Sequence, residues 1–213
     1  MFRWTATMVY TQSQFLSFQS FLDQYGNNPR YELADGELLD MDPTGPHEMV
    51  AGKVSTRLGT EIDRLGYPWF IPKSCLLRPF SDQATARRPD AIVLDETALV
   101  NEPFWNYEPV ITQGKSVKLV VEVVSTNWEN DYARKVEEYA LFRIPEYWIV
   151  DFRGLGGTAY IGRPKQPTIT VCNLVGDDYE QEQFRLSDPI VSPLFSELKF
   201  TLQDLMPRSN NHG

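Results

Sequence analysis

The stretch Leu119-Val120-Val121-Glu122-Val123-Val124 places one glutamate inside an otherwise apolar run. Continuous apolar runs of this kind are typical of strands that are covered on both faces. Two more runs share the pattern: Ala91-Ile92-Val93-Leu94, which directly follows Asp90, and Tyr147-Trp148-Ile149-Val150. Together the three segments predict the interior of one sheet.

Three segments with helical spacing of apolar residues surround these strands. The first runs from a capping-box pattern at Thr11 to Tyr25, and the second from about His47 to Leu65, before Gly66. The third begins at Asn130 or Asp131 and continues to Arg143, where the following Pro145 ends it.

Shorter segments complete the predicted α/β fold. Asp35-Gly36 separates Tyr31–Ala34 from Glu37–Met41 and favours a two-residue hairpin turn. Trp69–Ile71 and Cys75–Leu77 are further strand candidates, and Thr168–Val171 and Tyr179–Leu186 predict a peripheral antiparallel C-terminal addition. The order of elements indicates a mixed central sheet flanked by helices. We expect one domain over residues 1–207, with its core at about 11–152 and a polar tail at 208–213.

Composition limits the possible classes of protein. The 213 residues are 42% hydrophobic and 23% charged, which excludes wholesale disorder, and the longest apolar runs are far shorter than the ~20 residues that cross a bilayer. Because no secretory signal is visible and Cys75 and Cys172 stand alone, we expect a soluble cytoplasmic protein without a disulfide framework. A net charge of −9 argues against a general basic footprint for nucleic acid, although a bound cation can reverse the local sign.

Two acidic residues stand out because they accompany buried strands. Asp90 opens one apolar run and Glu122 lies inside another, where an ionised carboxylate needs a cation, a hydrogen-bond donor or a raised pKa. Lys135, on the inward edge of the third helix, is a candidate partner for Glu122, and Asp131 lies one turn earlier on the same edge. This pattern fits a structural salt bridge about as well as a catalytic site.

The catalytic interpretation predicts a metal site. Asp90, Glu122 and the backbone carbonyl of Val123 would form an oxygen-only set suited to Mg²⁺ or Mn²⁺. Lys135 beside the metal would help to orient and deprotonate water, or would offset charge in the transition state.

Other polar residues are weaker candidates, each with an ordinary structural alternative. His47 could act as a general base or contact a phosphate. Its structural alternative is a hydrogen-bonded histidine at the end of the apolar stripe of the second predicted helix. Glu37 and Glu48 could supply a further acid near the metal, and the structural alternative is that their side chains are solvated. Arg87 and Arg88 touch a phosphate, or hold Asp90.

In combination these segments resemble the Uma2 family, formerly a domain of unknown function that is abundant in cyanobacteria. The resemblance spans about Phe15 to Asp151 and rests on Tyr31-Glu32-Leu33-x-Asp35-Gly36-Glu37-Leu38, Arg88-Pro89-Asp90, Val121-Glu122-Val123-Val124-Ser125, Lys135 with Tyr139, and Ile144-Pro145-Glu146-Tyr147-Trp148-Ile149-Val150-Asp151.

The resemblance implies the restriction-endonuclease-like fold of the PD-(D/E)XK superfamily, with a mixed sheet between helices. It assigns Asp90 and Glu122 as the first and second metal-binding acids. The lysine that the superfamily places two residues after the second acid is Val124 in this chain, and Lys135 fits the position that the family uses instead.

We therefore expect a Mg²⁺-dependent endonuclease that hydrolyses phosphodiester bonds of nucleic acid by metal-activated water, with DNA as the expected substrate; the sequence alone leaves the choice between DNA and RNA open. The alternative is a nuclease-fold binding or assembly module without catalysis, in which Asp90, Glu122 and Lys135 form a structural polar cluster. Edge strands and aromatic loops predict a homodimer.

Overall fold

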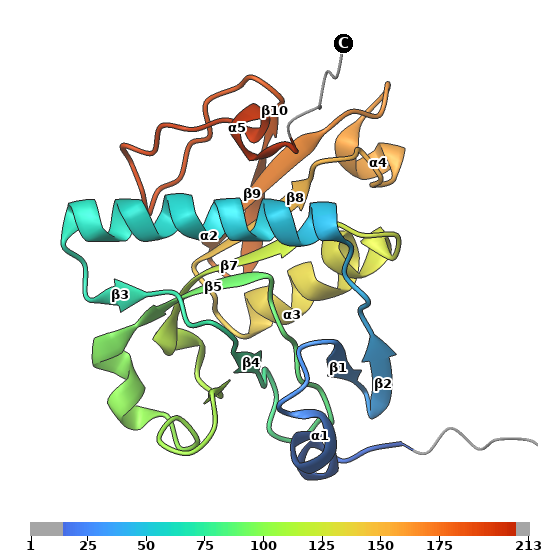
Figure 1. The fold of residues 1–213 in the computed structure, drawn as a ribbon, viewed down its shortest axis with the longest axis vertical. Helices are drawn as coiled ribbons and strands as arrows, with labels where there is room; N and C mark the ends of the chain where they lie inside the picture. Colours follow the sequence, from blue (N-terminus) through green and yellow to red (C-terminus); the bar gives the residue numbers. More distant parts are fainter. Residues whose placement is uncertain (1–14, 208–213) are drawn as a thin grey trace, which may run out of the picture.

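The computed structural model describes residues 15–207, and its centre is a six-stranded mixed sheet (Figure 1). The strand order is β10-β9-β8-β7-β5-β3; β7 and β8 are parallel, and the other neighbours are antiparallel. The strands are β3 (Trp69–Phe70), β5 (Ala91–Asp95), β7 (Val117–Val123), β8 (Glu146–Asp151), β9 (Thr168–Val175) and β10 (Asp178–Arg185). The three predicted interior strands are the adjacent β5, β7 and β8, which confirms the mixed central sheet.

Helices cover both faces of the sheet. Helix α2 (Gly45–Leu65) lies across one face, and α3 (Lys135–Leu141) packs on the other (Figure 1). Successive side chains of β7 alternate between the two layers, so that Val121 and Val123 join the core under α2 while Val120 joins the core under α3. This alternation turns Glu122 toward the α3 face.

The predicted hairpin consists of β1 (Tyr31–Ala34) and β2 (Glu37–Asp40). Asp35 and Gly36 adopt φ values of +50° and +85°, the left-handed conformations that a tight turn of this hand requires. The hairpin packs with α1 (Phe18–Tyr25) in a third hydrophobic cluster, beside the short parallel pair β4 (Leu76–Leu77) and β6 (Val110–Ile111).

Two predicted helix boundaries differ from the structure. The first helix begins at Phe18, because the Ser17 side chain caps it by accepting from the backbone N–H of Ser20; the predicted capping box at Thr11 lies outside the described residues. The third helix ends at Leu141, since Arg143 adopts φ +65° and reverses the chain before Pro145 is reached.

The C-terminal hairpin extends the central sheet at its edge, because β9 pairs with β8 from Thr168 to Asn173. The following segment returns over α2 and ends in α5 (Leu202–Leu205). The remaining elements are α4 (Thr158–Ile161), two 3₁₀ turns (Glu96–Asn101 and Gly114–Ser116) and a π-helical turn (Asn130–Arg134). Among the helices of residues 15–207, none has the length and apolar character needed to span a membrane.

Candidate functional site

The two predicted metal-binding acids come from neighbouring strands. Because Ala91 of β5 pairs with Val121 of β7, Asp90 lies just before one strand and Glu122 near the end of the other. The backbone N–H of Val123 donates to Asp90 Oδ2 at 2.6 Å and holds this carboxylate against β7. The sheet register therefore brings the two acids to one end of the β5–β7 pair.

Glu122 is buried and is bonded at both carboxylate oxygens. Tyr139 Oη donates to Oε1 at 2.6 Å, and Lys135 Nζ lies 2.9 Å from Oε2. Asp131 Oδ1 and Glu32 Oε1 lie 3.2 Å and 3.8 Å from the same ammonium group. Three carboxylates thus surround one buried cation, whose residue is only 1% exposed.

The surplus of carboxylates changes their proton affinity. Burial raises the pKa of Glu122 to about 7, although the charge of Lys135 opposes this shift. Burial and then the neighbouring charge of Glu122 raise the pKa of Asp90 well above its usual range, and burial also raises that of Asp131. For Lys135, burial alone would lower the pKa, but the charges of the three carboxylates around it outweigh burial and raise the pKa. Lys135 therefore stays an ammonium group at neutral pH, and its single positive charge is shared by the three carboxylates around it.

A π-helical turn precedes α3 and presents Asp131 and Lys135 to the sheet. The backbone N–H of Lys135 bonds to the carbonyl of Asn130, five residues earlier, which widens the turn. The Tyr147 hydroxyl fixes this turn by donating to the Asp131 carbonyl at 2.9 Å. Single π-helical turns are rare and occur frequently at functional sites.

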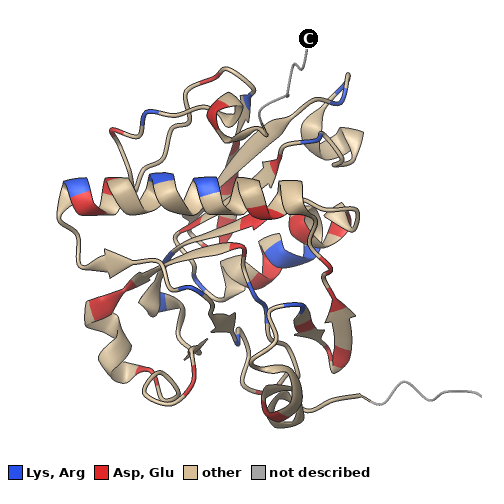
Figure 2. Cartoon of the chain, viewed as in Figure 1, with Lys and Arg blue, Asp and Glu red and all other residues tan. Residues whose placement is uncertain are grey.

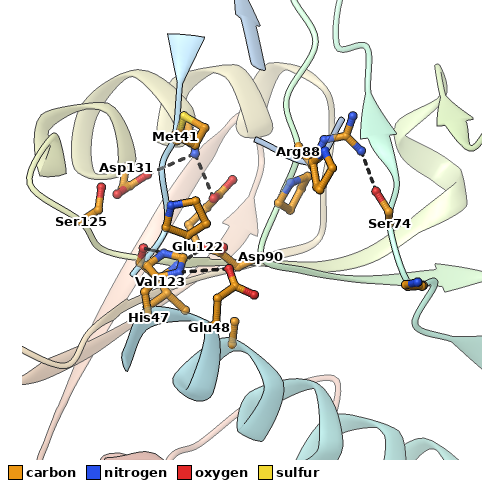
Figure 3. A pocket seen from close by; sticks show the side chains of 16 residues that line it. Met41, His47, Glu48, Ser74, Arg88, Asp90, Glu122, Val123, Ser125 and Asp131 are labelled. Carbon is orange, nitrogen blue, oxygen red and sulfur yellow. Dashed lines mark hydrogen bonds and ion pairs between the residues drawn. The ribbon is translucent and has the colours of Figure 1, made fainter. Parts of the chain in front are cut away.

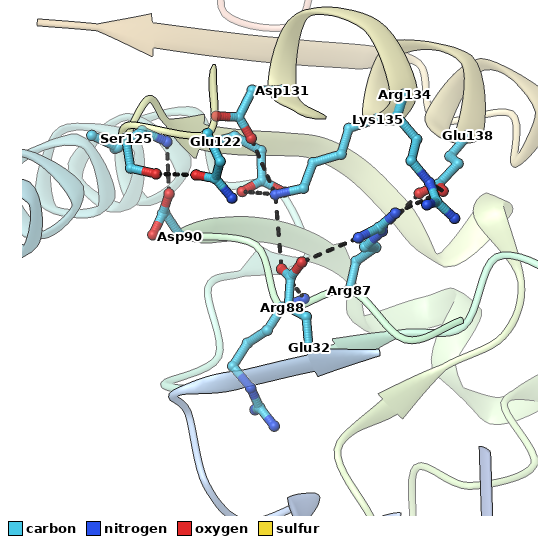
Figure 4. A network of polar contacts seen from close by, with 12 residues as sticks. Glu32, Arg87, Arg88, Asp90, Glu122, Ser125, Asp131, Arg134, Lys135 and Glu138 are labelled. Carbon is cyan, nitrogen blue, oxygen red and sulfur yellow. Dashed lines mark hydrogen bonds and ion pairs between the residues drawn. The ribbon is translucent and has the colours of Figure 1, made fainter. Parts of the chain in front are cut away.

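A buried ion-pair network supports Lys135 from the side of the hairpin (Figure 4). Arg87, fully buried, donates to both oxygens of Glu138 at 2.7 and 2.8 Å, and its Nη1 lies 3.4 Å from Glu32. Arg134 joins Glu138 to Asp35 at the hairpin turn. The network thus links the hairpin to the helix that carries Lys135.

His47 lies on the α2 side of the acids, in the first turn of that helix, whereas Lys135 lies on the α3 side. Its Nε2 lies 2.8 Å from the Val123 carbonyl oxygen and 3.5 Å from Asp90 Oδ2. Burial lowers the pKa of His47, so the ring is neutral at pH 7 and its Nε2–H donates to the carbonyl. The neighbouring Glu48 is largely exposed, with an oxygen 3.8 Å from His47 Nδ1.

A pocket of about 160 Å³ opens over these residues (Figure 3). Its wall includes every predicted site residue except Glu37 and Arg87: His47, Glu48, Arg88, Asp90, Glu122, Val123, Asp131 and Lys135. Glu37 is exposed on β2 and does not line the pocket. Figure 2 shows basic and acidic positions next to each other on the helical segment that includes α3.

Neither arginine contacts Asp90. The Arg87 side chain binds Glu138 and Glu32. The Arg88 side chain donates instead to Ser74 Oγ at 2.6 Å and to the Gly26 carbonyl at 2.8 Å. The interpretation that these arginines hold the acid is therefore not supported by their contacts.

The donor set fits a hard divalent cation by its chemistry. Asp90, Glu122 and the Val123 carbonyl offer oxygen ligands, which Mg²⁺ and Mn²⁺ prefer, and three carboxylates share the single ammonium group of Lys135. Within the described part of the chain, no group of three or more His, Cys, Asp or Glu side chains lies close enough to hold a metal ion as it stands. Glu122 and Asp131 instead contact the ammonium group of Lys135.

Three residues of the site were not singled out as site residues from the sequence: Glu32, Glu138 and the hydroxyl of Tyr139. For Glu32 the sequence offers only its place on the same face of a short predicted strand as Ala34, and its burial, with 1% exposed, is seen only in the structure. The sequence pattern predicts Glu138 as an ordinary acid on the surface of a helix, and only the tertiary fold brings Arg87 to it.

Comparisons with known proteins agree with this architecture. The crystal structure of a "putative nuclease belonging to DUF820" from Anabaena variabilis ATCC 29413 is similar, with a TM-score of 0.64 and 15% sequence identity over 89% of this chain and 97% of that chain. No curated protein matches. The family model of Uma2, described as "Putative restriction endonuclease", matches residues 18–203, and the chain therefore belongs to the Uma2 family.

Proposed function

We propose that this protein is a divalent-metal-dependent endonuclease that hydrolyses phosphodiester bonds of nucleic acid, with DNA as the expected substrate. The family and the nuclease-like fold support a nuclease function. The observation that carries the proposal is the position of Asp90 and Glu122 beside Lys135 in an open pocket, with more buried negative than positive charge.

In this proposal Asp90, Glu122 and the carbonyl oxygen of Val123 would hold Mg²⁺ or Mn²⁺. The cation would supply Lewis acidity toward the phosphoryl group and would lower the pKa of attacking water. His47 would orient the Val123 carbonyl through its Nε2–H, and the Val123 N–H would orient Asp90. The outer contacts of metal ligands commonly tune affinity in this way.

Lys135 has a defined electrostatic role in the proposal. Because its pKa is raised, the ammonium group keeps its proton and does not act as a general base at neutral pH. Its position 2.9 Å from Glu122 lets it fix that carboxylate and offset negative charge that develops on the phosphoryl group. Asp131, 3.2 Å away, would hold the ammonium group in place.

The alternative, a binding or assembly module without catalysis, is favoured by one observation. Both oxygens of Glu122 already have partners within the protein, as expected for a self-contained structural cluster. Basic side chains on α2 also offer few contacts to a nucleic-acid backbone, since Arg64 pairs with Glu61 and Lys53 binds the carbonyls of Leu205 and Met206. Metal titration distinguishes the endonuclease from the binding module, because a structural cluster should bind no Mn²⁺ at useful affinity.

A homodimer and a cytoplasmic location complete the proposal. Two-fold pairing would present two sites to one duplex. Size-exclusion chromatography with light scattering tests the dimer, and a monomeric mass at working concentrations would remove it.

The decisive experiment compares cleavage of plasmid, linear duplex, single-stranded DNA and RNA in Mg²⁺ or Mn²⁺. We expect Asp90→Asn and Glu122→Gln to lose at least about 100-fold in rate, because each removes a charged metal ligand. Glu37→Gln makes the same chemical change at an exposed hairpin position and should keep full activity. Lys135→Ala tests the proposed role of the ammonium group.

Two outcomes would contradict the proposal. Full metal-dependent cleavage by well-folded Asp90→Asn and Glu122→Gln would show that the reaction occurs elsewhere. Failure of the wild type to cut any substrate, together with no Mn²⁺ binding, would favour the binding module.

A further inference from the structure

One side of the pocket carries positive charge. Lys73, Ser74 and Arg88 line the same pocket as Asp90 and Glu122. Figure 3 shows Arg88 and Ser74 side by side and apart from the two acids. The pocket is thus divided between acidic groups that suit a cation and donors that suit an anion.

The guanidinium of Arg88 forms no ion pair among residues 15–207; Glu32 accepts only from the backbone N–H of Arg88, at 2.9 Å. Its terminal nitrogens donate to two neutral acceptors, Ser74 Oγ and the Gly26 carbonyl, and its buried Nε has no acceptor. The adjacent Arg87, by contrast, binds both oxygens of Glu138. Because a partly buried guanidinium without a direct ion pair is costly, the position of Arg88 is best explained by an anion that binds beside it.

Two neighbouring donors complete the anion site. The Ser74 hydroxyl oxygen already accepts from Arg88, so its own proton is available to another acceptor. Lys73 is exposed at the pocket and, within the part of the chain that the structure describes, forms no ion pair. A guanidinium, a hydroxyl and an ammonium group together are typical of phosphate recognition.

We propose that Arg88, Ser74 and Lys73 form a subsite that binds a phosphate group of the nucleic-acid strand next to the phosphate that is cleaved. This inference rests on the proposed function, since it names how the same pocket holds its substrate. The subsite supplies local positive charge that a chain of net charge −9 lacks overall, and it places the strand beside Asp90 and Glu122.

Binding measurements without cleavage test the subsite. A short labelled single strand of DNA is titrated with wild type, Arg88→Gln, Arg88→Lys and Lys73→Gln, with Ca²⁺ in place of Mg²⁺ and a gel to confirm that the strand stays intact. The titrations are repeated between about 50 and 200 mM KCl, because each phosphate contact to a single strand contributes about 0.7 to the slope of log affinity against log salt.

We expect Arg88→Gln and Lys73→Gln each to bind more weakly and to lower this slope by about 0.7, and Arg88→Lys to restore the slope. Lys115→Gln removes an exposed charge at the other end of β7 and should match the wild type. Lys73→Gln keeps the test decisive if Arg88→Gln fails to fold. Strands with 5′-hydroxyl and 5′-phosphate ends identify the bound group: an equal loss for both indicates an internal phosphodiester, and a loss confined to the phosphorylated strand indicates a terminal phosphate.

Wild-type affinity and slope in the folded variants would overturn the subsite, as would failure of the wild type to bind any strand. The two proposals fail separately. Cleavage by the wild type with an unchanged slope in the variants removes only the subsite. A reduced slope in the variants without cleavage by the wild type removes only the endonuclease.

Discussion

Lys135 and Glu122 meet between α3 and β7, with Nζ 2.9 Å from Oε2, and both residues are almost completely buried. An ion pair in such a place has to recover the cost of removing two charges from water. Tyr139 assists by donating to the second carboxylate oxygen, while Asp131 and Glu32 add further negative charge near the ammonium group. The pair is therefore one part of an unbalanced cluster, and this imbalance leads to testable effects on stability.

Replacing Lys135 should destabilise the protein strongly. Lys135→Met leaves three buried carboxylates without their shared ammonium group, so we expect the free energy of unfolding to fall by about 3–5 kcal/mol at neutral pH. The double variant Lys135→Met/Glu122→Gln should recover part of this loss, because it removes one of the uncompensated charges. Urea unfolding of both single variants and the double variant gives the coupling. Simply additive losses would show that the pair does not interact as described.

The carboxylate surplus should make stability depend on pH in a defined direction. The folded protein holds a proton on Glu122 up to about pH 7, whereas the ordinary value for this carboxyl is 4.5. Between these values the Glu122 carboxyl binds more protons in the folded state than in the unfolded chain, so its contribution to the free energy of unfolding should decrease as pH rises from about 4.5 to about 7 in EDTA.

A divalent cation should reverse this loss, since it supplies the missing positive charge. Urea unfolding from pH 4.5 to 8, with EDTA or with Mn²⁺, tests the prediction, and Glu122→Gln is the control that should flatten the pH dependence. The same pH dependence in EDTA for the wild type and for Glu122→Gln would contradict the raised pKa of Glu122.

The sequence allowed the sheet and the acids to be predicted, because both depend on local pattern. Apolar runs identify β5, β7 and β8, and an acid at the start or inside of such a run has few structural explanations. The proximity of Asp90 and Glu122 then follows from pairing of adjacent strands. The helical spacing from Asp131 to Lys135 likewise places those two side chains on one edge.

The supporting contacts could not be predicted, because they join segments that are distant in the chain. Arg87 is equally compatible with a phosphate or with Asp90 until the fold brings Glu138 and Glu32 to it. The π-helical turn at Asn130 depends on contacts such as the one from Tyr147, and no local residue pattern marks it. Tertiary packing decides these features.

Arg87 should be a sensitive position for stability. Arg87→Lys keeps the charge but loses the two-point contact with Glu138, so we expect a loss of about 2–3 kcal/mol, or roughly 4–12 °C in Tm for a chain of this size. Arg30→Lys is the matched control: Arg30 also contacts both oxygens of a carboxylate, that of Asp40, but its side chain is 48% exposed. This exposed pair should contribute less than about 1 kcal/mol. Equal changes in Tm for the two variants would show that burial of the Arg87 network adds nothing.

His47 should set metal affinity without being indispensable for the fold. Its Nε2–H holds the Val123 carbonyl at 2.8 Å, and loss of such an outer contact typically weakens metal binding by about 10–100-fold. We expect His47→Ala to show this loss in calorimetric titration with Mn²⁺ at pH 7, and His47→Gln, which keeps an N–H donor, to retain more of the affinity. Glu48→Gln changes the largely exposed neighbour and should bind Mn²⁺ within a few-fold of the wild type. If His47→Ala binds Mn²⁺ as tightly as the wild type, the carbonyl of Val123 is not a ligand that His47 orients, and the metal site would have to be built from Asp90 and Glu122 alone.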